Sequence, residues 1–508
     1  MKKETKIQIV KDVQDDFEVR RIVRRPLELQ WQLNIDFLRG NQNNYITSFD
    51  SVAAMGARYH WQKREVFNHI STLVETRLGK LADNKEQLTV VPLSSTERDI
   101  QCAEKCEKII KSAFKKVNMA ALADQANMWS EMTGSAFYKI VWENNGGKVL
   151  GYLNHPVTAS PCHPSKEVSK YLSANYKEVL DTSEKEAKSP NCLRESTRGA
   201  FEGGEVVFEG DVRVVVCSPF EIYPDSLTAG DVNEAGSIIH AKPYSTQAIR
   251  RIWGVDVAGN DVEVFDFNRT NKHGTGVLKN AAMVIERYKD GRLTIVAGDK
   301  LLFDGEYNQM PFVRQTSESL PGSFFGKSVI ERAIPVQRAY NTVKNRKTEF
   351  LNRLACGVLA VEENSTDIEA LENDGLAPGT IITYKSGMKA PVFLDGGSVP
   401  AELEREEERL LNEMAVITGG SSFVRGEGSL SGVALEILVE QDRLRIRRAI
   451  VSAQNAAINV ASHILRLYKR YGGERRLDRL ASGRCVELFT WSADDITSDE
   501  VVTTPSSA

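Results

Sequence analysis

The chain has 508 residues, 41% of them hydrophobic and 26% charged, which is the composition of an ordinary soluble globular protein with enough apolar material for real cores. By length it could form two to four domains or one elaborated architecture. The formal net charge of −4 excludes the overall basic character of proteins that grip nucleic acid, so any contact with DNA has to be local or weak.

Targeting, membrane and metal signals are missing from the sequence. The N-terminal region is charged throughout, and no run of about 20 apolar residues is long enough to span a bilayer. The seven cysteines are dispersed and odd in number, which predicts a reducing compartment. Cys102 and Cys106 are four residues apart, but no further ligands complete a zinc site. We therefore expect no metal, no cofactor and no membrane contact.

The first third of the chain predicts helices followed by a strand. Pro26 should mark a break or a first turn, and Thr96 with Asp99 predicts a capped helix start. Alternating apolar residues predict a strand over 135–143, directly after a helix that ends at Gly134. The segment 144–205 is expected to be an irregular surface insertion. The predicted helices cover 14–45, 62–82, 96–117 and 119–133, and a short edge strand covers 87–93.

The middle of the chain predicts more strands than helices. Residues 205–217 form two strands around a turn at Gly210, and a short helix covers 245–253. Further strands are expected near 262–267, 282–288, 293–297 and 300–303. Together with the helices before them, these strands predict an α+β fold.

Long helices dominate the sequence after residue 326. Ser328 with Glu331 predicts a capping box for a helix over 329–355, about 40 Å long, and Pro335 should kink it. A small α/β piece follows, then a helix over 400–419, a glycine-rich loop, and a helix over 432–470. Within the small piece we expect strands at 357–362, 378–385 and 390–394 and a helical turn at 366–373. The chain then ends in one strand, near 486–491, and a polar tail.

The glycine-rich stretch 418–432 permits three interpretations. A phosphate-binding P-loop would follow a strand and carry a lysine, whereas this stretch follows a helix and carries none. Gly426 and Gly428 begin a dinucleotide fingerprint, but Gly432 comes one residue too late to complete it. A plain flexible linker therefore stays open, as does a loop that touches a partner without gripping it.

The two helices before this loop have opposite charge. Segment 402–414 has a net charge of −4, and segment 327–355 has a net charge of +5. This predicts that the two helices lie side by side, within one subunit or between subunits. Solvated helix faces are the alternative.

Several segments, in order, are similar to one known family. The chain resembles the portal (head-to-tail connector) proteins of tailed bacteriophages, over most of residues 60–500. The matching segments are ISTLVETRLGKLADNKEQLTVVP, WSEMTGSAFYKIVWE, SPFEIYPD, FFGKSVIERAIPVQRAYNTVKNRKTEFLNRLACGVLAVEE, APGTIITYKSGMKAPVFL and SLSGVALEILVEQDRLRIRRAI.

The resemblance implies a portal-type subunit with named parts. Its α/β wing, paired stem helices, clip and tunnel loop would be followed by a long helix that returns to the wing. The helical crown found at the end of relatives would be short or absent. The implied boundaries are 1–325 (wing), 326–356 (first stem helix), 357–399 (clip), 400–418 (second stem helix), 419–431 (tunnel loop), 432–471 (long helix) and 472–508 (wing strand and polar tail).

The resemblance also implies site residues but no catalytic or metal-binding residue. For the tunnel loop beside DNA they are Gly419, Gly420, Ser421, Ser422, Phe423, Val424, Arg425 and Gly426. For the stem and ring interface they are Arg338, Lys344, Lys347, Glu404, Glu407 and Glu408. For the clip surface that docks terminase and the tail they are Thr380, Tyr384, Lys385 and Lys389.

The implied function is a ring-shaped channel, usually of twelve subunits, at one vertex of the virion, assembled in the host bacterial cytoplasm. The implied partners are copies of the chain, double-stranded DNA, the terminase large subunit, capsid and scaffold proteins, and head-completion or tail adaptor proteins. A nucleic-acid-processing metalloenzyme, with an acidic cluster at 492–500, and another virion adaptor are the alternatives.

Overall fold

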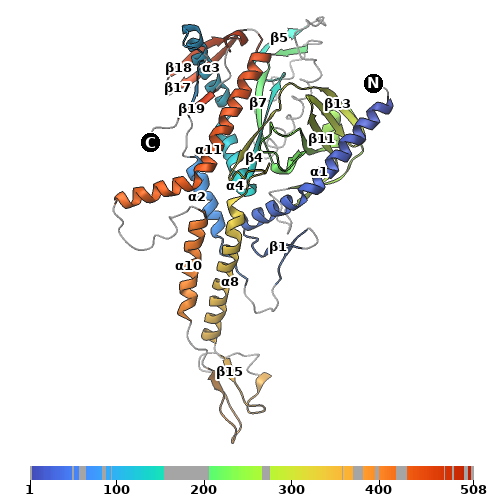
Figure 1. Ribbon diagram of the computed structural model, residues 1–508. Coiled ribbons are helices and arrows are strands. Elements are labelled where there is room, and N and C mark those ends of the chain that lie inside the picture. Colours follow the sequence, from blue (N-terminus) through green and yellow to red (C-terminus); the bar gives the residue numbers. More distant parts are fainter. Residues whose placement is uncertain are drawn as a thin grey trace.

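The architecture combines helices and several small sheets, as the α+β prediction requires. The computed structural model describes residues 3–47, 51–56, 64–82, 87–92, 94–153, 205–265, 275–356, 358–369, 381–394, 400–418, 432–473, 475–482, 485–496 and 501–504. Figure 1 shows a broad body from which two helices project side by side as a stalk, with a small tip at the far end. The stalk is α8 (Val329–Cys356) and α10 (Ala401–Thr418). The tip is the described part of the chain between them, and the body is everything else.

Helix α1 (Lys3–Leu38) is longer at its N-terminus than the predicted 14–45 helix and ends sooner. It also continues through Pro26, so the expected break there is wrong. The reason is tertiary: Val10, Val13 and Phe17 are spaced by three and four residues and are buried against a sheet. This spacing keeps the charged N-terminal region helical.

Arginine side chains also hold α1 to the body. Arg24 is almost fully buried and donates to the carbonyl oxygens of Pro219 (3.0 Å) and Phe220 (2.8 Å).

The second long helix of the chain, α2 (His69–Ala82), begins seven residues later than the predicted 62–82 helix.

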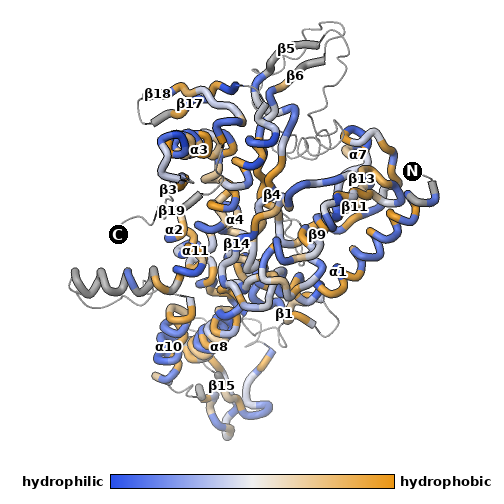
Figure 2. The backbone as a smooth tube through the Cα atoms, turned by 45° about the horizontal axis from the view of Figure 1, so that its top comes forward, coloured by the Kyte–Doolittle hydropathy of each residue, from blue (hydrophilic) through white to orange (hydrophobic). Residues whose placement is uncertain are grey.

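A fully buried strand, β4 (Ser135–Glu143), lies at the centre of the body. It pairs antiparallel with β14 (Phe312–Thr316) on one side and β7 (Asp211–Cys217) on the other. Its predicted alternation is confirmed, because Tyr138 and Trp142 pack into one core and Phe137 packs into another. In Figure 2 apolar segments recur along β4 and α4, whereas α1 and α3 alternate between polar and apolar residues.

Two capped helices precede β4 as predicted. Helix α3 (Glu97–Lys116) begins with the Thr96 side chain accepting from the backbone of Asp99, and α4 (Met119–Thr133) ends at Gly134 with a left-handed backbone. These local signals are strong because they satisfy backbone groups that a helix end would otherwise leave unpaired.

A larger, six-stranded sheet forms the side of the body that α1 covers. Its strand order is β13-β12-β11-β9-β8, and β10 also pairs with β11. The α1 side chains Val13 and Phe17 pack here against Ile285 and Val296. The strands are β8 (Ile222–Pro224), β9 (Ser237–Ser245), β10 (Asn260–Phe265), β11 (Thr275–Lys289), β12 (Arg292–Ala297) and β13 (Lys300–Glu306), and α7 (Thr246–Trp253) follows β9.

Helix α11 (Gly432–Tyr471) runs back into the body, where Val460, Ile464 and Leu465 join the core around β4. Figure 1 shows that this helix is bent rather than straight. The strand predicted near 486–491 is confirmed as β18 (Cys485–Trp491), but the prediction that it is the last and single strand is wrong, because it forms a hairpin with β17 (Arg476–Ser482) and a further strand follows. This further strand is β19 (Val501–Thr504), which pairs with β3 (Gln87–Val90).

The tip contains one antiparallel strand pair. Val358–Ala360 (β15) pairs with Val392–Leu394 (β16), as the predicted outer strands require. The middle strand predicted at 378–385 is not formed over 381–385, which is irregular. The remaining short elements are β1 (Asn44–Ile46), β2 (Val52–Ala54), β5 (Val149–Leu153), β6 (Glu205–Phe208) and the 3-10 turns η1 (Pro219–Glu221) and η3 (Ala493–Asp495).

Candidate functional site

The two stalk helices are joined by ion pairs within the chain. Lys344 of α8 contacts Glu407 of α10, and Lys347 lies 3.2 Å from Glu404 and 3.4 Å from Glu407. The Tyr340 hydroxyl also donates to Glu407, over 3.3 Å. The opposite charges predicted from the sequence are therefore used to hold the stalk together.

The lysines of α8 favour the charged state of Glu407. Burial raises the pKa of Glu407, but Lys344 and Lys347 lower it more, so its pKa lies below its ordinary value. A carboxylate with a lowered pKa contributes stability above its ordinary pKa and loses that contribution as the pH falls through the lowered value. The stalk pair is therefore intact at neutral pH and weakens in acid.

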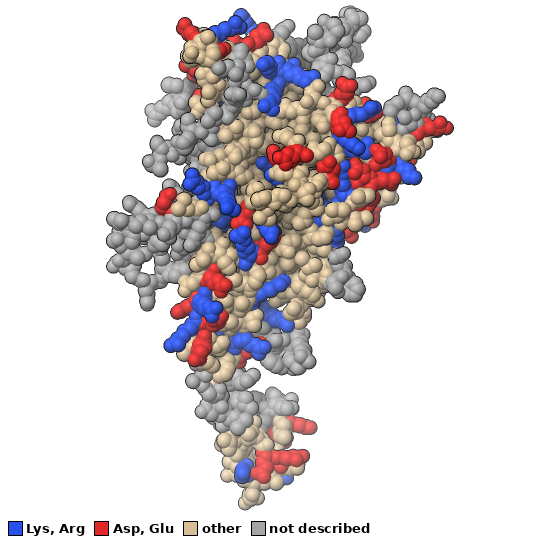
Figure 3. Space-filling view, viewed as in Figure 1, with Lys and Arg blue, Asp and Glu red and all other residues tan. Residues whose placement is uncertain are grey.

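The six residues predicted at a ring interface do not share one environment. Lys344, Lys347, Glu404 and Glu407 have partners in their own chain, so they do not need a neighbouring copy to balance their charge. Glu408 is exposed on α10. Figure 3 shows acidic and basic side chains intermingled on the stalk, rather than an area of a single sign on this face. The ring-interface role stays a prediction.

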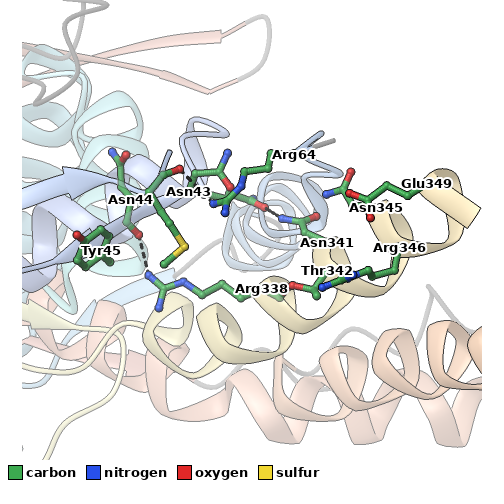
Figure 4. Close-up of a pocket in the computed structure, with 12 residues that line it drawn as sticks. Asn43, Asn44, Tyr45, Arg64, Arg338, Asn341, Thr342, Asn345, Arg346 and Glu349 are labelled. Atoms are coloured by element: carbon green, nitrogen blue, oxygen red, sulfur yellow. Dashed lines mark hydrogen bonds between the residues drawn. The ribbon is translucent and has the colours of Figure 1, made fainter. Parts of the chain in front are cut away.

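Arg338, the sixth of these residues, lines a polar pocket of about 400 Å³ where α8 enters the body. Its guanidinium donates to the Asn44 carbonyl over 2.7 Å, and the Asn341 amide donates to Gln42 over 2.6 Å (Figure 4). Burial lowers the pKa of Arg338. The pocket is lined by Gln42, Asn43, Asn44, Tyr45, Met55, Arg64, Arg338, Asn341, Thr342, Asn345, Arg346 and Glu349.

Three arginines against one glutamate make this pocket basic, and its other polar groups are mostly amides. The sequence signal for it was the spacing of Arg338, Asn341, Asn345 and Glu349, which places them on one face of α8. Sequence reasoning assigned Arg338 to an interface but missed the pocket, because its other wall comes from residues about 300 positions away.

A buried ion pair anchors the end of α10 to the body. Arg77 of α2 donates to both carboxylate oxygens of Glu131, over 2.6 and 3.2 Å, and also to the carbonyl of Thr418, over 3.1 Å. Glu131 is fully buried and also accepts from the Ser317 hydroxyl over 2.8 Å. Thr418 directly precedes the glycine-rich loop, so this cluster holds the point at which that loop begins.

The other predicted site residues are described only in part. All eight predicted tunnel-loop residues, Gly419 to Gly426, lie outside the described residues, and so does Thr380. Tyr384, Lys385 and Lys389 lie exposed at the tip. The Lys385 backbone donates to the Ser365 carbonyl over 2.9 Å, which orders this part of the tip.

Among the described residues, one group of three side chains could hold a metal ion. Cys217, Glu221 and His240, in the body, form a group whose ligand atoms lie within 4.8 Å of one another. The acidic segment that begins at 492 uses Asp495 in an ion pair with Lys105 at 2.8 Å, and its residues 497–500 lie outside the described residues. None of the described helices combines the length and the apolar character needed to cross a bilayer.

No protein-family profile matches the chain, and no curated protein is significantly similar to it. A functional conclusion therefore depends on the segments quoted above and on the geometry of the stalk, tip and body.

Proposed function

We propose that the protein is a phage portal subunit, whose copies form a ring at one capsid vertex through which double-stranded DNA is packaged and ejected. The observation that carries this proposal is the arrangement of the stalk, the tip and the long helix relative to the body. A two-helix stalk holds a small β module at its far end, and after the glycine-rich segment a long helix returns to the body. In this proposal the body is the wing, the stalk is the stem and the tip is the clip.

The charge of the chain suits a conduit. Duplex DNA carries one charge per about 1.7 Å, and every basic side chain that neutralises a phosphate adds affinity by releasing counterions. A basic channel would hold the DNA, whereas an acidic or mixed wall lets it slide. The stalk offers a mixed surface, because Lys344 and Lys347 are paired with glutamates of the same chain and side chains of both signs are intermingled on it.

The partners follow from the same proposal. The chain carries no P-loop sequence, so a separate terminase has to supply the motor and would dock on the exposed tip around Tyr384, Lys385 and Lys389. Head-completion or tail adaptor proteins would later take that place. The rings would form through head-to-tail contacts that close on themselves.

Particle shape and activity test the proposal directly. Electron microscopy and native mass measurement of the purified full chain should give closed rings, with a hole of about 20–40 Å that admits a duplex. Nuclease and ATPase assays with divalent metal should give no turnover. A chain that stays monomeric at every concentration, or that cleaves DNA unaided, contradicts the proposal and favours the metalloenzyme.

Reversing the charge of Glu408 should impair ring formation without unfolding the chain. Glu408 is an exposed acidic residue of the predicted interface, so Glu408→Lys should change the melting temperature little, because exposed substitutions usually shift stability by about 0.5 kcal/mol or less. Sizing by light scattering would measure the fraction of rings. The control Glu408→Gln removes the charge without reversing it and should have a smaller effect. Intact rings from Glu408→Lys would exclude this residue from the interface.

Arg425 is expected to modulate DNA retention rather than movement. It is the single basic residue in the glycine-rich segment and would offer one transient phosphate contact per subunit. Particles with Arg425→Ala should package DNA at the normal rate and lose more of it on storage, as measured by nuclease-sensitive DNA. Retention equal to the wild type would show that this arginine has no such role.

A further inference from the structure

A thiol, a carboxylate and an imidazole meet in the body. Cys217 ends β7, Glu221 lies in η1 and His240 lies in β9. Cys217 and His240 are buried, and Glu221 is half-buried. They line a cavity of about 40 Å³ together with Lys139, Val215, Val216, Lys242, Tyr244 and Glu286.

The chain brings these three residues together because β7, η1, β8 and β9 follow one another around a tight corner. Ile222 pairs with His240, so the residue next to Glu221 lies beside the histidine. The spacing of four and then nineteen residues matches no short metal-binding motif, so the group could not be recognised from the sequence.

The imidazole is held between two carboxylates. Its Nε2 lies 3.4 Å from Glu221, and its Nδ1 lies 3.5 Å from Glu286. Glu286 is fixed in turn by Lys139 Nζ at 2.6 Å and by the Tyr288 hydroxyl at 2.9 Å. A histidine that ligates a metal through one nitrogen almost always donates from the other to a carboxylate, a backbone carbonyl or a water, which sets its tautomer and orientation, and Glu286 is such a carboxylate.

We propose that Cys217, Glu221 and His240 bind a divalent transition metal ion, for which Zn²⁺ is the best fit. Thiolate, imidazole and carboxylate are the three ligand types of protein zinc sites. Ligand atoms around a tetrahedral Zn²⁺ lie about 3.5 Å apart, given bond lengths of about 2.0–2.3 Å. The present separations, up to 4.8 Å, therefore require side-chain movements of roughly 1 Å. The cavity leaves room for a water as the fourth ligand.

A metal ion binds the thiolate form of a cysteine and the neutral form of a histidine, so binding at this cluster should weaken as the pH falls.

Cobalt provides a direct test on the full-length protein. After dialysis against a chelator, titration with Co²⁺ should give a thiolate-to-cobalt charge-transfer absorption that saturates at one ion per chain, and Zn²⁺ should abolish it. Addition of Zn²⁺ should also raise the melting temperature, because it binds only the folded state. Repeating the titration at lower pH should give weaker binding, because the ligands have to be deprotonated.

Variants locate the site. Cys217→Ser should abolish the absorption, and Glu286→Gln should weaken binding by about 10–100-fold, as expected for a carboxylate that orients a ligating histidine. The control Cys106→Ser removes another buried thiol, whose pKa burial raises to about 12, and should leave the absorption unchanged. Folded wild-type protein that gives no such absorption overturns the proposal, as does an absorption that persists in Cys217→Ser.

Discussion

Replacing Gly134 with alanine is expected to destabilise the protein by about 3 kcal/mol or more, the sum of a left-handed backbone and an overpacked contact. Gly134 ends α4 with φ +90°, and a Cβ there would lie 2.1 Å from the carbonyl oxygen of Gly326. The obstacle is backbone, so no side-chain rotation can relieve the contact. Melting temperature and soluble yield of the full-length variant would measure the effect.

Gly254→Ala is the matched control for this prediction. Gly254 ends α7 with φ +69°, but nothing lies within 4 Å of the position of its Cβ. This variant should therefore show only the left-handed backbone cost, about 1–2 kcal/mol. Equal losses in the two variants would mean that the Gly134–Gly326 contact does not constrain the body.

The close approach of Gly134 to Gly326 shows which part of a helix end can be predicted from nearby residues and which part cannot. The sequence predicted that α4 ends at this glycine, because glycine readily adopts the left-handed conformation that closes a helix. It did not predict the reason why only glycine fits, since Gly326 is almost 200 residues further on. This second glycine lies just before α8, so the contact also sets where the stalk leaves the body.

Elements with a strong internal period or a cap were predictable. The alternation in β4, the Thr96 cap and the stalk helices were all predicted and confirmed, because each depends on residues close in sequence. Helix α1 was predicted with the wrong bounds, because its N-terminal half is stabilised by burial of Val10, Val13 and Phe17 against a sheet that is distant in sequence. Strand β19 was missed because its partner, β3, lies about 400 residues earlier.

In the candidate site, too, the features that depend on neighbouring residues were predictable and the others were not. Opposite charges on α8 and α10 predicted that the two helices associate, and the structure supports this. Composition alone did not decide whether the association is within or between chains. The pocket around Arg338 was missed because its walls come from residues about 300 positions apart, and the group around His240 was missed because its spacing matches no short metal-binding motif.

Replacing Arg77 with methionine is expected to cost about 3–5 kcal/mol, the range for breaking a buried ion pair from one side. The variant leaves the fully buried Glu131 with its Ser317 hydrogen bond and without its charged partner. It also removes the donor to the Thr418 carbonyl at the end of α10. The expected result is a lower melting temperature together with faster hydrogen exchange over the last turn of α10.

Two further variants separate the two roles of Arg77, which are to neutralise Glu131 and to hold the Thr418 carbonyl. The double variant Arg77→Met with Glu131→Gln removes both charges and should recover part of the stability, because no unpaired charge is then buried. It should not restore slow exchange near Thr418, since the guanidinium that holds this carbonyl is still missing. Arg77→Lys keeps the charge but loses the two-pronged contact with Glu131, so it should fall between the wild type and Arg77→Met. If the double variant restored slow exchange as well, Arg77 would serve only to neutralise Glu131, and the start of the glycine-rich segment would be held by the stalk alone.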